Sequence, residues 1–269
     1  MMLPNDFELH RPATIADASQ LRAQLGDSAA LYAGGTELLL AMKLGVLAYD
    51  HLIDVKRIQA LHGIARENGH LRIGAAVTHR ELETDPRVPP ALAELERNVA
   101  NVRVRAAGTL AGNLAFAEPH ADPPALLIAL GARVVLASAS GRRELALEDF
   151  IVGPYETELG GDELIEAVIV PILDPDVRAT YRKFQVLERP AVGVAAVGRV
   201  RDGVLVEPPT VVVGAVDERP VRIPADDLDA LAMAAAEAVD PVDDLSGSAD
   251  YKRHLTGALA QRAVQALKT

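Results

Sequence analysis

The chain contains no cysteine among its 269 residues. Without a thiol it cannot form a disulfide, present a thiolate nucleophile, or supply cysteine ligands to zinc or to an iron–sulfur cluster. Any cysteine-ligated metal centre that works with this chain must therefore be held by another chain.

Long apolar runs are also missing. No uncharged stretch approaches the roughly 18 residues of a membrane-spanning helix. Asp6 and Glu8 interrupt the region in which a secretory signal would need an apolar core. We therefore expect a cytoplasmic protein without a membrane span.

The chain has fewer basic than acidic residues. The chain has 27 Lys and Arg against 38 Asp and Glu, and the resulting net charge of −11 is spread along the sequence. This balance argues against binding the phosphate backbone of a nucleic acid, so we predict no nucleic-acid partner. Hydrophobic residues at 49% and charged residues at 24% are typical of globular proteins, and the length suits one large or two modest domains.

Several common catalytic motifs are incomplete or absent. Residues 193–198 have the glycine spacing of a Walker A loop, but Arg199 and Val200 stand where lysine and serine or threonine are required. The sequence has no G-x-G-x-x-G fingerprint and no G-x-S-x-G elbow. The seven histidines form no i, i+4 pair, and His120 with Asp122 offers only two ligands. We therefore predict no metal site in this chain.

Apolar spacing and capping residues predict a mixture of helices and strands. The expected helices are 14–26, 37–44, a short one opened by Thr78 and Glu81, 90–101, 125–130, 228–239 and 250–267. The expected strands are 30–33, 51–55, 71–77, 133–137, 144–147, 181–187, 192–200 and 210–216. Residues 108–124 are expected to be irregular, residues 201–203 to form a hairpin turn, and residues 174–176 to mark a domain boundary.

Two glycine-bearing loops are the strongest chemical signal. Residues 33–37 (Ala-Gly-Gly-Thr-Glu) follow an expected strand and precede an expected helix, where free N–H groups attract phosphate. Residues 108–113 add Thr109 and Asn113 beside their glycines, and Asp122 offers an acceptor for a ribose or a flavin ring N–H. Two such loops would suit a pyrophosphate-linked cofactor. Glycine pairs also occur in ordinary tight turns, so the pattern alone leaves both interpretations open.

Several motifs, in order and at matching spacing, closely resemble the FAD-binding medium subunit of the molybdenum hydroxylases. That family includes carbon monoxide dehydrogenase, xanthine dehydrogenase and aldehyde oxidoreductases. The resemblance covers nearly the whole chain and is carried by residues 31–43 (LYAGGTELLLAMK), 52–58 (LIDVKRI), 71–75 (LRIGA) with Thr78 and His79, 108–114 (GTLAGNL) and 119–131 (PHADPPALLIALG).

The resemblance implies an α+β protein with a FAD-binding fold of the para-cresol methylhydroxylase or vanillyl-alcohol oxidase type, made of two α+β subdomains. A C-terminal α+β domain of the carbon monoxide dehydrogenase flavoprotein type would follow. The corresponding ranges are 1–172 for the FAD-binding domain, with subdomains of about 1–56 and 57–172, and 177–269 for the C-terminal domain.

The same resemblance assigns cofactor-binding residues and no catalytic acid or base. The pyrophosphate would lie between Ala33, Gly34, Gly35 and Thr36 on one side and Thr109, Ala111, Gly112 and Asn113 on the other. Asp122 matches an acidic position near the cofactor, and Tyr181, Lys183 and residues 188–192 match the region that approaches the flavin ring.

Three features depart from the family pattern, and one of them is that the loop around Arg189 and Pro190 lacks the aspartate often found before the following apolar strand. The other two are single residues of the glycine loops. Ala111 replaces a common glycine, and its methyl group is tolerable where φ is negative. Glu37 replaces Ser or Asp, and its carboxylate would repel a pyrophosphate unless it turns outward; an acidic residue in a first helical turn also interacts favourably with the helix dipole.

The implied function is electron transfer through FAD. Electrons would arrive from iron–sulfur clusters on a small subunit, beside a large molybdenum-cofactor subunit, in a heterotrimer or its dimer. They would leave to a quinone, NAD, oxygen or another carrier. One alternative is a standalone FAD-dependent oxidase or dehydrogenase of a small molecule. A second is a flavin-free assembly protein that has kept the fold, for which Ala111 and Glu37 are the only sequence support.

Overall fold

The structure, a computed structural model, describes residues 6–269 and begins with a small parallel sheet and its helices. The strands are β1 (Glu8–His10), β2 (Ala29–Tyr32) and β3 (His51–Asp54), in the order β1-β3-β2. The helices are α1 (Ile15–Leu25) and α2 (Leu38–Lys43), with a 3-10 turn at Gly26–Ser28. Thr14 caps α1 by accepting from the N–H of Asp17 at 3.1 Å, as the sequence predicts.

A second, antiparallel sheet follows, with strand order β4-β5-β10-β6-β7. Its strands are β4 (Ile64–Glu67), β5 (His70–Gly74), β6 (Arg133–Ala137), β7 (Arg142–Ala146) and β10 (Leu164–Pro171). The accompanying elements are the 3-10 turn Gln59–Leu61, α3 (His79–Thr84), α4 (Pro90–Arg97), α5 (Val102–Ala107), α6 (Leu110–Phe116), α7 (Pro123–Ala129), α8 (Leu147–Phe150) and the hairpin of β8 (Ile151–Gly153) and β9 (Glu156–Thr157).

Two of the differences from the sequence expectations in this part of the chain concern β10 and residues 108–124. The central strand β10 was not predicted, although its residues are largely buried between β5 and β6. Residues 108–124 are not irregular throughout, because α6 occupies Leu110–Phe116 and begins at a threonine cap. That cap lies within the second glycine loop, so the loop is also the start of a helix.

A third sheet and two helices complete the chain. The strands are β11 (Val177–Gln185), β12 (Pro190–Arg201), β13 (Val204–Leu205), β14 (Thr210–Gly214) and β15 (Val221–Ile223), and the helices are α9 (Leu231–Glu237) and α10 (Ala249–Leu267). The predicted hairpin turn is confirmed: Asp202 and Gly203, with φ of 51° and 76°, join β12 to β13. The strand expected over 181–187 instead begins at Val177 and ends at Gln185.

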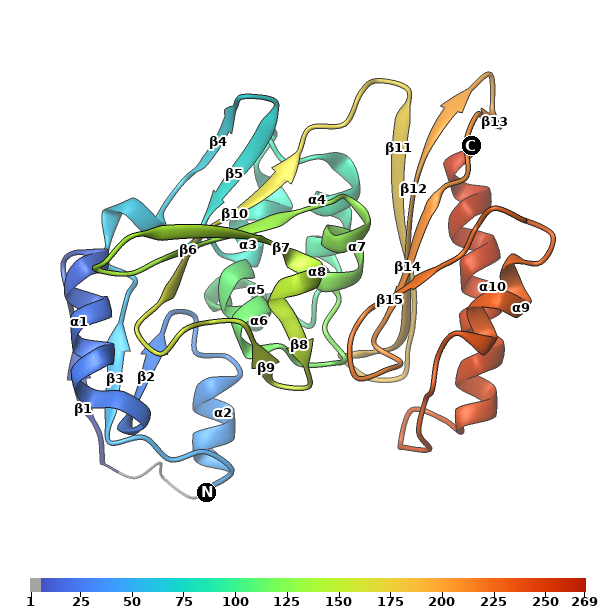
Figure 1. The fold of residues 1–269 in the computed structure, drawn as a ribbon. Coiled ribbons are helices and arrows are strands. Elements are labelled where there is room, and N and C mark those ends of the chain that lie inside the picture. Colours follow the sequence, from blue (N-terminus) through green and yellow to red (C-terminus); the bar gives the residue numbers. More distant parts are fainter. Residues whose placement is uncertain (1–5) are drawn as a thin grey trace.

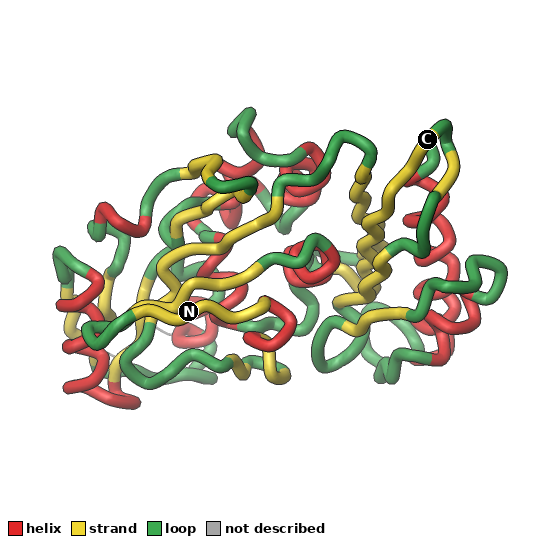
Figure 2. The backbone as a smooth tube through the Cα atoms, turned by 45° about the horizontal axis from the view of Figure 1, so that its top comes forward, coloured by secondary structure: helices red, strands yellow, loops and turns green. Residues whose placement is uncertain are grey.

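The third sheet lies between the helices of the preceding part and the C-terminal helices (Figure 1). One face contacts α7, and α10 runs along the other face (Figure 2). Leu259, Ala263 and Leu267 of α10 are buried. The overall fold is therefore α+β, as expected. No helix within residues 6–269 is both long enough and apolar enough to cross a membrane.

Candidate functional site

A cavity of about 670 Å³ lies where the two glycine loops meet. Its volume is in the range of cofactor and small-molecule sites. Most of the cofactor-binding residues expected from the sequence line it, namely Ala33, Gly34, Gly35, Thr36, Glu37, Thr109, Ala111, Gly112, Asn113 and Asp122. Tyr181 and Lys183 do not line it, but both contact Asp122. The fold thus gathers residues that are far apart in the sequence around one space.

Gly34 allows the two loops to touch. A Cβ atom at this position would lie 2.3 Å from the carbonyl oxygen of Ala107 and 2.6 Å from the Cα of Gly108. Both atoms belong to the backbone, so neither can move aside easily. Gly35 is required for a different reason: its φ is +69°, and a Cβ there would lie 2.3 Å from the ring of Tyr32.

The first loop leaves donors free. Within residues 6–269, the backbone N–H groups of residues 34–37 donate no hydrogen bond. The Nζ of Lys56 donates to the carbonyl of Ala33 at 3.1 Å, pairs with Asp54 at 2.8 Å, and lies 3.6 Å from the centre of the Tyr32 ring. Consecutive free N–H groups beside a fixed cation form a surface suited to an anion.

The second loop is fixed by a helix cap. Thr109 is 3% exposed, and its hydroxyl oxygen accepts from the N–H of Gly112 at 3.0 Å, which starts α6. Ala111 lies inside this helix and does not have a positive φ. Its methyl group therefore causes no backbone strain. Asn113 lines the cavity, and its buried Oδ1 has no hydrogen-bond partner in the described part of the chain. This oxygen is therefore free to accept a hydrogen bond from a group bound in the cavity.

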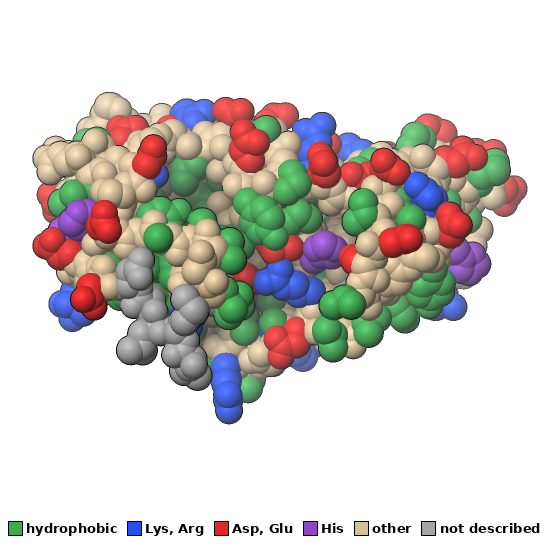
Figure 3. Space-filling view, turned by 90° about the horizontal axis from the view of Figure 1, so that it is seen from below, with side chains coloured by type: hydrophobic (Ala, Val, Ile, Leu, Met, Phe, Trp, Pro, Cys, Tyr) green, Lys and Arg blue, Asp and Glu red, His purple; other side chains and the backbone are tan. Residues whose placement is uncertain are grey.

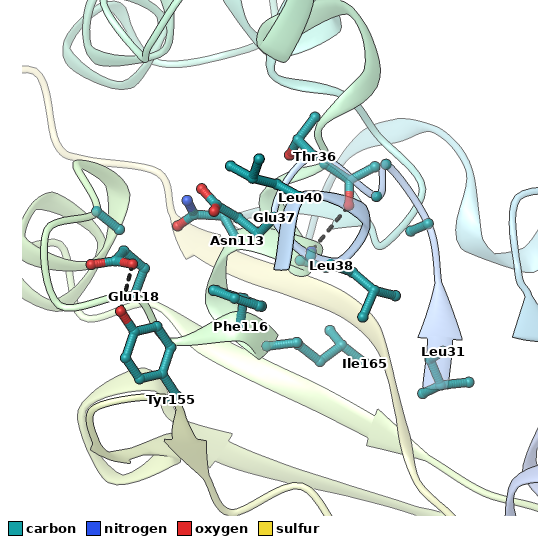
Figure 4. A pocket seen from close by; sticks show the side chains of 18 of the residues that line it. Leu31, Thr36, Glu37, Leu38, Leu40, Asn113, Phe116, Glu118, Tyr155 and Ile165 are labelled. Atoms are coloured by element: carbon teal, nitrogen blue, oxygen red, sulfur yellow. Dashed lines mark hydrogen bonds between the residues drawn. The ribbon is translucent and has the colours of Figure 1, made fainter. Parts of the chain in front are cut away.

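Charged residues from distant segments meet at another part of the cavity. Arg189 donates to the carboxylate of Glu37 at 2.8 Å and also pairs with Glu118. The hydroxyl of Tyr155 donates to Glu118 at 2.9 Å, with Phe116 beside the Tyr155 ring (Figure 4). Glu37 carries no capping bond in α2, so Arg189 rather than the helix end is its main partner.

The pKa of Glu118 reflects this environment. Burial opposes its ionisation, but the hydrogen bond from His120, the charge of Arg189 and the hydrogen bond from Tyr155 outweigh burial and lower its pKa to about 2. Glu118 is therefore a fixed negative charge at neutral pH. In the view from below, basic and histidine side chains lie near the middle of the face with acidic side chains beside them (Figure 3).

Asp122 connects the cavity to the third sheet. It is 4% exposed and accepts from the hydroxyl of Tyr181 at 3.0 Å and from Lys183 at 3.2 Å, and Lys183 also forms an ion pair with it at 3.0 Å. Burial raises the pKa of Asp122, while the charge and hydrogen bond of Lys183 oppose the rise. Burial also raises the pKa of the Tyr181 phenol well above its usual value. Lys183 further donates to the carbonyl of Asn98 at 2.7 Å, which ties β11 to the end of α4.

Sequence reasoning missed several residues of the site. Glu118 and Tyr155 line the cavity but belong to no recognisable motif. Lys56 does not line it but holds the first loop through the carbonyl of Ala33, and it lies within a family-like segment without a role of its own. Arg189 lies in a loop expected near the cofactor, but its pairing with Glu37 joins residues 152 positions apart. Only the folded arrangement reveals these contacts, since none has a fixed spacing in the sequence.

Comparison with known proteins gives a consistent answer. Residues 5–173 match the family model of the FAD binding domain in molybdopterin dehydrogenase. The chain is 34% identical to the carbon monoxide dehydrogenase medium chain of Hydrogenophaga pseudoflava over 282 residues, covering 98% of each. A solved structure of carbon monoxide dehydrogenase from that organism superposes with a TM-score of 0.94 at 33% identity, covering 99% of this chain and 98% of that one.

A second enzyme has the same architecture. The structure of quinoline 2-oxidoreductase from Pseudomonas putida 86 superposes with a TM-score of 0.91 at 30% identity, covering 99% of this chain and 98% of the other. These matches confirm the predicted resemblance, and with it the α+β fold and FAD as the cofactor. The chain therefore belongs to the molybdopterin dehydrogenase family, as an FAD-binding, electron-transferring oxidoreductase subunit.

Proposed function

We propose that this chain holds FAD between its two glycine loops and relays electrons within a complex of unlike subunits. A small subunit would carry the iron–sulfur clusters and a large subunit the molybdenum cofactor, in a heterotrimer or its dimer. Relatives named as medium chains support this division of labour, and so does the absence of cysteine from this chain. Electrons would then leave to an external acceptor.

The contact of the two glycine loops is the observation that carries the proposal. Gly34 brings residues 33–37 against the backbone at Ala107 and Gly108, and the residues that carry the free N–H groups and the orphaned Asn113 oxygen line the same cavity. A dinucleotide offers what these groups lack: phosphate oxygens that accept from N–H groups, and hydroxyl or amide donors for the asparagine oxygen. The residues present therefore fit FAD.

The protein groups would have separate tasks. The N–H groups of residues 34–37 would bind phosphate oxygens, and Asn113 would fix the orientation of the cofactor. Arg189 would hold the Glu37 carboxylate away from the phosphates, since the two side chains already form an ion pair. Asp122, held by Tyr181 and Lys183, would present an immobile acceptor. Bound FAD supplies the electron-carrying chemistry, and the protein supplies position and solvent exclusion.

We assign residues 1–172 as the FAD-binding domain, with subdomains of about 1–56 and 57–172, and residues 177–269 as the C-terminal domain. The first range is close to the segment that matches the FAD-binding family model. The third sheet and its helices account for the second range. In this assignment the contacts of Asp122 with Tyr181 and Lys183 join the two domains.

The visible spectrum of the purified full chain and its native partners tests the proposal. We expect the absorption of oxidised flavin, released on denaturation as FAD, and co-purification with an iron–sulfur chain and a molybdenum chain. A colourless chain that ignores added FAD would instead indicate a flavin-free assembly protein. Turnover of a small molecule by the flavin-containing chain without partners would favour a standalone oxidase and contradict the subunit role.

A further inference from the structure

Two histidines and a glutamate meet on the first sheet, outside the cavity. Glu8 and His10 lie two residues apart on β1, and His51 is the register partner of Glu8 on the adjacent parallel strand β3. The Nε2 of His10 lies 3.1 Å from the Nδ1 of His51, and the latter lies 3.6 Å from a carboxylate oxygen of Glu8. One nitrogen or oxygen from each residue can be chosen so that all three lie within 4.8 Å of one another.

The cluster is separate from the cofactor site. None of its residues lines the cavity, and β1 and β3 lie at the end of the molecule away from α10 (Figure 1). The two imidazoles are held in place, with side chains 18% and 24% exposed, whereas the Glu8 side chain is 66% exposed. The arrangement therefore combines two restrained nitrogen ligands with a carboxylate that solvent ions can reach.

We propose, against the expectation drawn from the histidine spacing in the sequence, that Glu8, His10 and His51 form a binding site for a divalent cation of the zinc class. Imidazole nitrogen and carboxylate oxygen are the ligands that such ions prefer, and three protein ligands with a water completing the shell is a common coordination. Bonds of about 2.0–2.1 Å in tetrahedral geometry place ligand atoms about 3.3–3.4 Å apart. The separations of 3.1 and 3.6 Å at His51 lie on either side of that value, so small rotations suffice.

The three side chains offer more to a bound cation than to one another. Without a metal, the two imidazoles share one hydrogen bond, in which one nitrogen donates and the other accepts. A bound cation would take a lone pair from each nitrogen, and Glu8 would neutralise part of its charge. The cation would also join β1 to β3 across 41 residues of sequence. Its role would be to fix the short N-terminal strand to the sheet that carries the first glycine loop on β2.

Calorimetric titration of the flavin-loaded full chain with Zn²⁺, in a form without a histidine tag and in a non-chelating buffer, tests the site. We expect one equivalent to bind in the wild type. His10→Gln and His51→Gln should each weaken binding by at least about tenfold. Glu8→Gln should do the same and should fold normally, because this side chain is largely exposed. His254→Gln, an exposed histidine on α10, is the matched control and should bind as the wild type does.

Thermal unfolding provides a second readout. Zn²⁺ should raise the unfolding temperature of the wild type and of His254→Gln, and should raise that of Glu8→Gln less, because the stabilisation falls as the affinity of the native state falls. Equal Zn²⁺ affinity in the wild type and in the Glu8, His10 and His51 variants would overturn the proposal and show adventitious binding only. Flavin content is expected to stay the same throughout, so this outcome is independent of the FAD assignment.

Discussion

One part of the cavity is made from backbone and another from charged side chains. At the glycine loops, Gly34 and Gly35 create the space, and unpartnered N–H groups provide the polarity. Where the third sheet meets the cavity, Arg189 pairs with Glu37 and Glu118, and Lys183 pairs with Asp122. A substitution at the first part should act through space and cofactor affinity. At the second part it should act through charge, on the stability of the fold and, at Arg189, on cofactor affinity as well.

The largest effect should come from breaking the buried pair of Lys183 and Asp122. Lys183→Met leaves the 4% exposed Asp122 without its cation, and such a loss costs about 3–5 kcal/mol of unfolding free energy. Urea unfolding measures it. The double variant Lys183→Met/Asp122→Asn should recover most of the loss, because it removes the uncompensated charge. A double variant as unstable as the single one would show that packing, not charge, holds this contact.

Glu118 should make stability depend on pH. Its folded pKa of about 2 lies below its ordinary value of 4.5, so its contribution is complete above about pH 4.5 and is lost as the pH falls toward 2. We expect Glu118→Gln to be about 2 kcal/mol less stable than the wild type at pH 6. The gap should narrow progressively below pH 4.5 in unfolding titrations. If the difference in unfolding free energy between the two proteins stays constant with pH, the lost stability comes from altered geometry and not from the charge of Glu118.

Asn113 should affect the cofactor more than the fold. Its orphaned Oδ1 predicts that Asn113→Ala weakens FAD binding about tenfold, or ~1.4 kcal/mol. The apo form of this variant should be no less stable than wild-type apo protein, because the substitution removes a buried unsatisfied group. Flavin fluorescence titration measures the FAD affinity, and urea unfolding of the apo form measures its stability. Loss of apo stability with unchanged FAD affinity would place Asn113 outside the site.

The smallest effect on FAD binding is expected at Arg189, whose side chain is 44% exposed. Arg189→Gln frees the Glu37 carboxylate beside the first loop and should weaken FAD binding by about 0.5–1 kcal/mol, less so at high salt. Glu37→Gln in the same chain should restore the affinity, since it removes the repulsive charge. If the double variant binds FAD no better than Arg189→Gln, the ion pair does not shield the loop.

The features that the sequence predicts are those built from backbone, and the features that it does not predict are contacts between distant side chains. The glycine loops could be found from sequence because backbone requirements leave local marks, such as Gly34 and Gly35 between a strand and a helix. The family resemblance then supplied the fold and the cofactor. The ion pairs of Arg189 and the meeting of His10 with His51 could not be found, because they join segments with no fixed spacing. The strand β10 was missed although its run of apolar, β-branched residues is a local signal of a buried strand. Only its place at the centre of the sheet depends on the folded arrangement.

The FAD affinity of Gly34→Ala tests most directly whether the two loops form one binding site. A methyl group there meets backbone at 2.3 Å, whereas at Gly161, which has nothing within 4 Å and no positive φ, it meets open space. We predict that Gly34→Ala loses at least about tenfold in FAD affinity and that Gly161→Ala keeps the wild-type value. Equal affinity in both variants, with both chains folded, would contradict a cofactor site built from the contact of these loops.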